Sequence, residues 1–283
     1  MKRTVFALGF LFVFAGCQKA KVDPSDNKVN GQNLSTSIEM PMQIPFYKGY
    51  FAGFHGSIGF NLQRDRGDYT TSSISCGAYF ENPTLDIDRI SVGGLELSSA
   101  NTVKDGHLHF GLRNAMHTEY TLSDLQNVKN LFGKNVRFLA NSGSRSSGVN
   151  IDDEIYVPQS LNLSVTDQTK MPRVNRTQGL QLNWDKDINN QHGVAIVLLW
   201  EGKKVGADKM LIEDNKAVRV QNLTIVEDDG SYSLQAADFK DMPKDAWVLV
   251  SVVRGNYKYV TSQGQNFQLS AFDMQNVDIT LND

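Results

Sequence analysis

The sequence predicts an all-β protein of two tandem antiparallel β-sandwiches, with one short helix in the first. Three observations lead to this fold class. Apolar and polar residues alternate with a period of two over much of the chain, glycine-rich steps separate these runs, and one segment near residue 125 changes to a helical period. The length fits two domains, since 283 residues with 40% hydrophobic side chains can fill two cores.

Residues 1–16 have the pattern of a secretory leader. Lys2 and Arg3 precede an apolar run, 4–16, whose 13 residues are too few for a membrane span of about 20. The run ends in Phe14-Ala15-Gly16-Cys17, which resembles a bacterial lipobox. The resemblance implies a lipoprotein signal peptide over residues 1–16, cleaved before a lipidated Cys17. The alternative is an ordinary secretory leader with an incidental cysteine.

A lipidated Cys17 would anchor the chain stably, because each buried CH₂ contributes about 0.8 kcal/mol and several acyl chains insert together. Gln18 follows, not the Asp that resembles an inner-membrane retention signal. We therefore expect the outer membrane of a Gram-negative cell, on its periplasmic or its cell-surface face. Residues 17–40 are polar and contain Pro24, which predicts a flexible tether.

Residues 41–158 are expected to form the N-terminal sandwich. Its strands are predicted around Ile58–Leu62, Ile74–Phe80, Ile90–Leu97, Val136–Phe138 and Ile155–Val157. Within Ile90–Leu97, Gly93-Gly94 predicts a tight hairpin turn. An aromatic stretch, 46–54, is interpreted as part of the core, with an exposed ligand platform as the alternative.

The short helix is predicted from Leu122, Leu125 and Val128, which recur at threes. Ser123 and Gln126 have the spacing of a capping box, and Gly133 stands where a C-cap is expected. These signals predict about three helical turns.

Residues 159–283 are expected to form the second sandwich, of about seven strands. The wholly apolar run Val194–Trp200 predicts a central strand covered on both faces, and Trp247–Val253 has nearly the same character. The sequence Arg254-Gly255-Asn256 is interpreted as a turn ending that strand. Further strands are predicted at Leu161–Val165, Leu180–Trp184, Val218–Val226, Tyr232–Leu234 and Val277–Leu281.

The stretch LQLNWDKDINNQHGVAIVLLWEG, with the later DDGSYSLQAADFKDMPKDAWVLVSVVRGNYK, resembles a fibronectin type III or immunoglobulin-like module. The resemblance implies that Trp184 lies in the core. The whole layout resembles bacterial surface lipoproteins with tandem β-sandwich domains. That resemblance implies a fold and a location, but no activity.

Charge and cysteine content limit the classes of function that the sequence supports. The 28 basic and 31 acidic side chains give a net charge of −3, and loss of Lys2 and Arg3 with the leader leaves 26 basic and 31 acidic, or −5. This balance argues against a nucleic-acid partner. Cys76 is the only cysteine besides Cys17, so a lipidated Cys17 leaves no intrachain disulfide. We interpret Cys76 as a small core residue.

His107 and His109 are the sharpest candidates for a metal site. Two residues apart on a strand, they point to one face, and His117 follows nearby. A zinc ion needs three or four protein ligands, to which Asp105 and Glu119 could add. We favour histidines on the solvent face, with a metal site as the alternative.

Three acidic segments could also carry chemistry. Asp185–Asn190 has oxygen-rich spacing, but without the glycine and glutamate of an EF-hand we favour a structural turn over a calcium loop. Asp152–Glu154 and Glu227–Asp229 are interpreted as solvated loops. The sequence contains no G-x-S-x-G, G-x-x-x-x-G-K-[ST] or G-x-G-x-x-G motif. We therefore expect no catalytic residues and no cofactor.

The sequence as a whole predicts a lipid-anchored, non-enzymatic envelope lipoprotein that binds or presents a partner. The partner would be an envelope protein, an envelope complex or a polysaccharide. Three alternatives remain: a carbohydrate-binding accessory lipoprotein of a glycan-uptake system, a pilin-like structural subunit, and a metal-dependent hydrolase.

Overall fold

The computed structural model describes residues 38–40, 55–65, 73–104, 107–112, 121–142, 148–166, 171–206, 210–213 and 219–282. Over these residues the protein is all-β, as the sequence predicts, with one α-helix and one short 3₁₀ helix. The leader, Cys17, the aromatic stretch 46–54, the residues 113–120 that include His117, and 143–147 lie outside the described residues. The last residues of the expected tether, Ile38–Met40, form strand β1.

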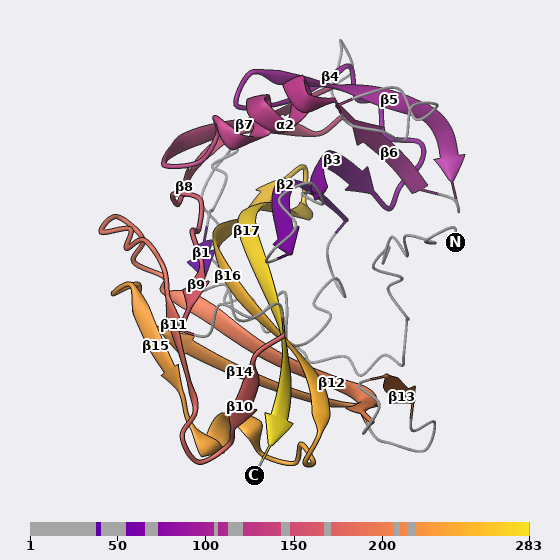
Figure 1. Ribbon diagram of the computed structural model, residues 1–283. Helices are drawn as coiled ribbons and strands as arrows, with labels where there is room; N and C mark the ends of the chain where they lie inside the picture. The colour runs from indigo at the N-terminus through magenta and orange to yellow at the C-terminus, as the bar shows by residue number, and fades with distance from the viewer. Residues whose placement is uncertain are drawn as a thin grey trace.

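The strands form one large mixed sheet and one small antiparallel sheet (Figure 1). The first body contains β2 (Gly56–Asp65), β3 (Ser73–Phe80), β4 (Arg89–Val92), β5 (Leu95–Lys104), β6 (His107–Gly111), α2 (Leu122–Lys129), β7 (Lys134–Asn141) and β8 (Asn150–Val157). The second contains β9 (Ser164–Val165), β10 (Arg173–Asn175), β11 (Leu180–Asn183), β12 (Val194–Val205), β13 (Leu211–Glu213), β14 (Val220–Val226), β15 (Ser231–Leu234) and the 3₁₀ helix η2 (Ala236–Phe239).

A long hairpin joins the two bodies. Its strands are β16 (Ala246–Ser262) and β17 (Gln265–Asn282), which run from the lower body into the upper one in Figure 1. One half of β16 pairs with β12, and β17 pairs in parallel with β2, from Phe267 opposite Gly56 to Asn276 opposite Asp65. The large sheet is therefore continuous from one body to the other.

The inner face of this hairpin contributes to two separate cores. Val260, Phe267 and Leu269 pack in the first core, with the alternating side chains of β2 and β3. Val248 and Ile279 pack in the second. Between the cores the same face carries polar residues, including Arg254 and Asp273. The two bodies thus share the β16–β17 hairpin, whose inner face is apolar towards both ends and polar in the middle.

The predicted hairpin around Gly93-Gly94 is confirmed. Both glycines have positive φ, 57° and 85°, and they join β4 to β5. A Cβ on Gly93 would lie 2.4 Å from Leu131 of the first core, so space as well as backbone conformation requires glycine there.

The helix is shorter than predicted, and its caps differ. Residues Leu122–Lys129 form about two turns, and the capping box is Thr121 with Asp124, not Ser123 with Gln126. The Thr121 amide donates to the Asp124 carboxylate over 2.7 Å. The C-cap is Asn130, whereas Gly133 lies beyond it, where its N–H donates to Val157 and φ is 77°. Gly133 therefore forms the turn into β7.

Strand β12 is central, as its apolar run predicts. Ile196 and Leu198 face the second core, and Ala195 packs on the opposite face in a smaller cluster with Val253 and Tyr257. Trp184 is also buried in the second core. The predicted strand at Leu161–Val165 is formed only at Ser164–Val165.

The predicted turn at Arg254-Gly255-Asn256 is wrong. These residues continue β16 without a break, and Arg254 pairs directly opposite Asp273 of β17. Glycine is required at position 255 because β17 passes very close: a Cβ on Gly255 would lie 2.3 Å from the Ala271 carbonyl oxygen. A strand of this length spans both bodies.

Candidate functional site

Two loops at one end of the second body line an open hollow of about 500 Å³. One loop, 185–193, precedes β12, and the other, 227–230, follows β14. They meet because β12 and β14 are antiparallel, with Val194 opposite Val226. The structure thus brings together two acidic segments that the sequence analysis treated separately.

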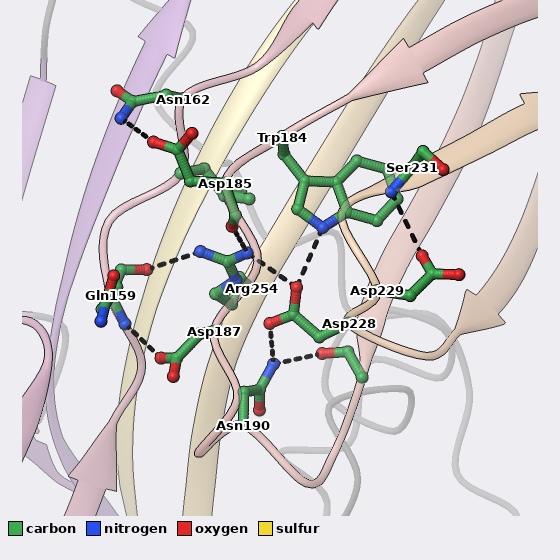
Figure 2. Close-up of polar contacts among 12 residues, drawn as sticks. Gln159, Asn162, Trp184, Asp185, Asp187, Asn190, Asp228, Asp229, Ser231 and Arg254 are labelled. Carbon is green, nitrogen blue, oxygen red and sulfur yellow. Dashed lines mark hydrogen bonds and ion pairs between the residues drawn. The ribbon is translucent and has the colours of Figure 1, made fainter.

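The buried side chains Asp187, Asn190 and Asp228 form the floor of the hollow. A polar network centred on Asp228 extends from this floor into the protein (Figure 2). Its Oδ1 accepts hydrogen bonds from Trp184 Nε1 at 2.9 Å and Arg254 Nη2 at 2.7 Å, and its Oδ2 accepts one from Asn190 Nδ2 at 2.9 Å. The Arg254 and Asp228 side chains are 0% and 1% exposed. Because the pair is desolvated, removing one partner leaves the other charge buried without compensation and is strongly destabilising.

Arg254 also fixes the backbone around the hollow. Its Nη1 donates to the carbonyl oxygen of Gln159 at 3.1 Å, and its Nη2 also donates to that of Asp185. One guanidinium therefore holds the 185–193 loop, the 227–230 loop and the segment that leaves the first body (Figure 2).

Asp187 ties the same loop to the first body. Its carboxylate accepts from the Tyr156 hydroxyl of β8 at 2.9 Å and from the Gln159 amide at 2.7 Å. It also accepts from the Asn189 amide of its own loop at 3.0 Å. Both carboxylate oxygens of Asp187 thus accept hydrogen bonds from the protein. This arrangement agrees with the structural turn favoured over a calcium loop at Asp185–Asn190.

The rim of the hollow differs from its floor. Lys186, Ile188, Gln191, Glu227 and Asp229 are exposed, with Ile188 at 81%. The rim thus offers one cation, two carboxylates, an amide and an apolar side chain to solvent. Such a mixed, exposed set on a rigid floor suits recognition of a partner surface.

A second polar cluster lies beside the network, where the chain passes between the bodies. The Oδ2 of Asp273 accepts from Ser160 Oγ at 2.6 Å, from the Leu161 amide at 2.7 Å and from the Arg64 guanidinium. Burial raises the pKa of the Asp273 carboxyl, against the opposing attraction of Arg64. This cluster fixes segment 159–161 against β2 and β17.

His107 and His109 lie on one face of β6, as expected, with Tyr79 of β3 between them. The Tyr79 ring centroid is 5.0 Å from that of His107 and 5.3 Å from that of His109. The Tyr79 hydroxyl and His107 Nδ1 are 3.0 Å apart. Leu108 and Phe110 pack on the first core. Among the described residues, no three His, Cys, Asp or Glu side chains are grouped so that they could hold a metal ion.

The acidic run Asp152–Glu154 is not a loop, because it lies within β8. Asp152 pairs with Arg137 on the surface, and the hydrogen bond from Arg137 lowers the pKa of the Asp152 carboxyl. Asp153 forms an ion pair with Lys258 of the long hairpin, whose Nζ lies 2.7 Å from Asp153 Oδ1. The run thus helps to join β8 to its neighbours.

Cys76 is a buried core residue, as interpreted from the sequence. It is 1% exposed, and burial raises the pKa of its thiol to about 12. The lipidation site Cys17 and the metal candidate His117 lie outside the described residues. Over the part of the chain that the structure describes, no helix combines the length and apolarity needed to cross a bilayer.

Several residues of the two polar clusters were missed from the sequence. Arg254, Asp273, Arg64 and Tyr156 come from four strands. The sequence analysis interpreted Arg254 as part of a turn and Tyr156 as a strand residue, whereas Arg64 and Asp273 lie outside its predicted strands. One signal in the sequence could have identified Arg254 as a buried residue: it is a charged residue that directly follows the apolar run Trp247–Val253.

No family model and no curated protein matches this chain. Among solved structures it is similar to the Yersinia pseudotuberculosis adhesin InvE, with 11% sequence identity and a TM-score of 0.20. The match covers 81% of this chain and 59% of the adhesin, so the chain spans less than two thirds of that protein. A likeness of this degree carries no argument about function.

Proposed function

We propose that the chain is a lipid-anchored envelope lipoprotein whose β-sandwich bodies bind or present a partner without enzymatic turnover. Cys17 is its lipidation site, and the outer membrane is its location. The second body is the fibronectin III-like or immunoglobulin-like module that presents the binding loops. The lipobox-like end of the leader supports the anchor.

The observation that carries the binding role is the contrast between floor and rim of the hollow. Asp228, Arg254 and Asp187 are held by hydrogen bonds to several segments, which fixes the loop backbones. Rim side chains such as Ile188 and Glu227 remain exposed. Binding residues commonly lie on loops that a rigid scaffold positions.

The same bonds make Asp228 and Asp187 poor candidates for a general base. A general base must offer a carboxylate oxygen to its substrate. Both oxygens of Asp228 and both of Asp187 already accept hydrogen bonds from protein donors. These carboxylates therefore serve as structural acceptors.

The anchor is tested by Cys17→Ala. The variant should leave the membrane fraction and lack the lipid mass carried by the wild type. Unchanged membrane association without lipid would contradict the proposal.

The binding site is tested by a photo-crosslinking amino acid at Ile188 on the rim. A discrete adduct should form in intact cells, and the same probe at Leu122, which is 86% exposed on the first body, should not give it. Equal adducts at both positions, or turnover of glycans or esters by purified protein, would contradict the proposal.

A further inference from the structure

The largest exposed apolar group among the described residues lies on strand β13 and just before it. Met210, Leu211 and Ile212 are 67%, 47% and 57% exposed, and they are consecutive. The other large apolar side chains that are exposed in the described ranges stand singly, at Leu122, Met171 and Ile188. Contiguous exposed apolar groups, unlike single ones, mark interaction sites.

This group sits on an arm that reaches past the second core. Strand β14 pairs with β12 only as far as Trp200, and β13 pairs with the continuation Lys203–Val205. The register between β12 and β16 shifts between Trp200 and Lys204, where the arm begins. The three residues of β13 are all exposed, which shows that the core does not cover them.

Apolar side chains of β13 project from both faces of the arm, beside Lys203 and Glu213 on one face and Lys204 on the other. Successive residues of a strand point to opposite faces, so Leu211 and Ile212 present apolar side chains in opposite directions. A flat protein surface can cover only one of these faces. A fluid apolar medium can surround both.

Charged side chains of both signs surround the arm. Lys204 stands opposite Ile212 in the strand pair, and Lys203 Nζ lies 3.8 Å from Glu213. Arg219 at the start of β14 pairs with Glu201 at 3.6 Å. Phospholipid headgroups also carry both signs, as phosphate and, in ethanolamine lipids, ammonium. The charges around the apolar tip therefore complement a headgroup layer.

From these observations we infer that the β13 arm is a membrane-contact site, whose Met210, Leu211 and Ile212 insert at the boundary between headgroups and acyl chains of a phospholipid bilayer. The inference builds on the anchor in the proposed function. The residues between Cys17 and β1 would span about 25 Å on average and about 70 Å when fully extended. The tether thus keeps the arm near the same bilayer, where the raised effective concentration adds to the affinity that the arm has by itself.

The first test measures insertion directly. In full-length protein carrying Cys17→Ala, Leu211→Cys is labelled with an environment-sensitive fluorophore, while Cys76 stays unlabelled in the core. Vesicles of phosphatidylethanolamine and phosphatidylglycerol should shift the emission to shorter wavelength and raise it several-fold. The matched Ile188→Cys label, at an equally apolar exposed position, should not respond. No response at 211, or equal responses at both positions, would overturn the inference.

The second test measures binding in the same Cys17→Ala background. Leu211→Asp together with Ile212→Asp should lower vesicle flotation by at least about tenfold, because each substitution removes a partly exposed large side chain from the apolar phase. Leu122→Asp, at an exposed apolar position on the first body, should leave flotation unchanged. If the parent instead sediments as a dimer that the double substitution dissociates, the occupant is a second copy and the inference is overturned. Neither test depends on lipidation, so a failed anchor and a failed arm are distinguishable.

Discussion

Arg254 of β16 and Asp228 of the loop after β14 form a buried ion pair, with Nη2 and Oδ1 2.7 Å apart. The pair lies between the two hydrophobic cores. Asp228 lines the hollow, and Figure 2 shows the hydrogen bonds that join it to Arg254 and its neighbours. The position and rigidity of the rim therefore depend on the same interaction that fixes the second body against the segment leaving the first.

Arg254→Ala should lower the free energy of unfolding by about 3–5 kcal/mol, because it leaves the Asp228 carboxylate buried without its cation. Urea denaturation of the purified Cys17→Ala protein measures this. Arg137→Ala is the matched control: its pair with Asp152 is exposed, and a loss of at most about 1 kcal/mol is expected. Equal losses in both variants would contradict the structural role of the Arg254 pair.

Cys76 should be nearly inert in the folded protein. With its pKa raised to about 12, its thiolate fraction at neutral pH is on the order of 1,000-fold below that of an ordinary thiol. In the Cys17→Ala variant, where it is the only cysteine, modification by iodoacetamide should be very slow in buffer and complete in denaturant. Rapid stoichiometric labelling of folded protein would disprove its placement in the core.

Asp273 should make the protein gain stability as the pH falls. Its carboxyl pKa is raised by burial in the folded state, so the folded chain binds the proton more tightly than the unfolded chain does. The wild type should therefore gain stability relative to Asp273→Asn as the pH drops through the folded-state pKa, and the gain should level off below the unfolded value of about 3.9.

Asp152 supplies a control with the opposite sign. Its pKa is lowered by the hydrogen bond from Arg137, so its stabilising contribution is lost as the pH falls through the folded-state pKa. Urea titrations at about pH 7, 5.5 and 4.5 compare Asp273→Asn, and Asp152→Asn as its control, with the wild type. A wild-type advantage over Asp273→Asn that shrinks on acidification would contradict the predicted direction.

Gly255→Val should destabilise the protein by roughly 1–3 kcal/mol or more, since its Cβ would meet the Ala271 carbonyl oxygen at 2.3 Å and Phe272 Cβ at 2.4 Å. Gly264→Asn at the tip of the same hairpin should be close to neutral. It has a φ of 74°, which Asn tolerates, and open space around its Cα. Thermal unfolding of both variants makes the comparison, and a neutral Gly255→Val would mean that β16 does not pass through this residue.

Most individual strands could be predicted because a period of two is a local signal. The alternation in Ile58–Leu62 and Ile74–Phe80 marks β2 and β3, and the Gly93-Gly94 step marks their neighbouring hairpin. The helix was located correctly, but Thr121/Asp124 and Ser123/Gln126 compete as capping boxes two residues apart. Only the geometry of the entering chain decides between them.

The long hairpin and the polar clusters could not be predicted in the same way. The parallel pairing of β2 with β17 depends on contacts between residues about 210 positions apart, which no local period encodes. Arg254-Gly255 has the composition of a turn, and only the distant Asp228 makes a buried arginine stable in mid-strand. The hollow likewise depends on two loops, 185–193 and 227–230, that meet only after β12 and β14 have paired.

The parallel pairing of β2 with β17 also sets the order in which the protein can mature. Gly56 is synthesised about 210 residues before its partner Phe267, so the first core lacks one wall until that later segment has emerged. Pairings so distant in sequence form slowly. The first core therefore closes only after the residues of the second body, which lie between these two strands in the sequence, have been synthesised.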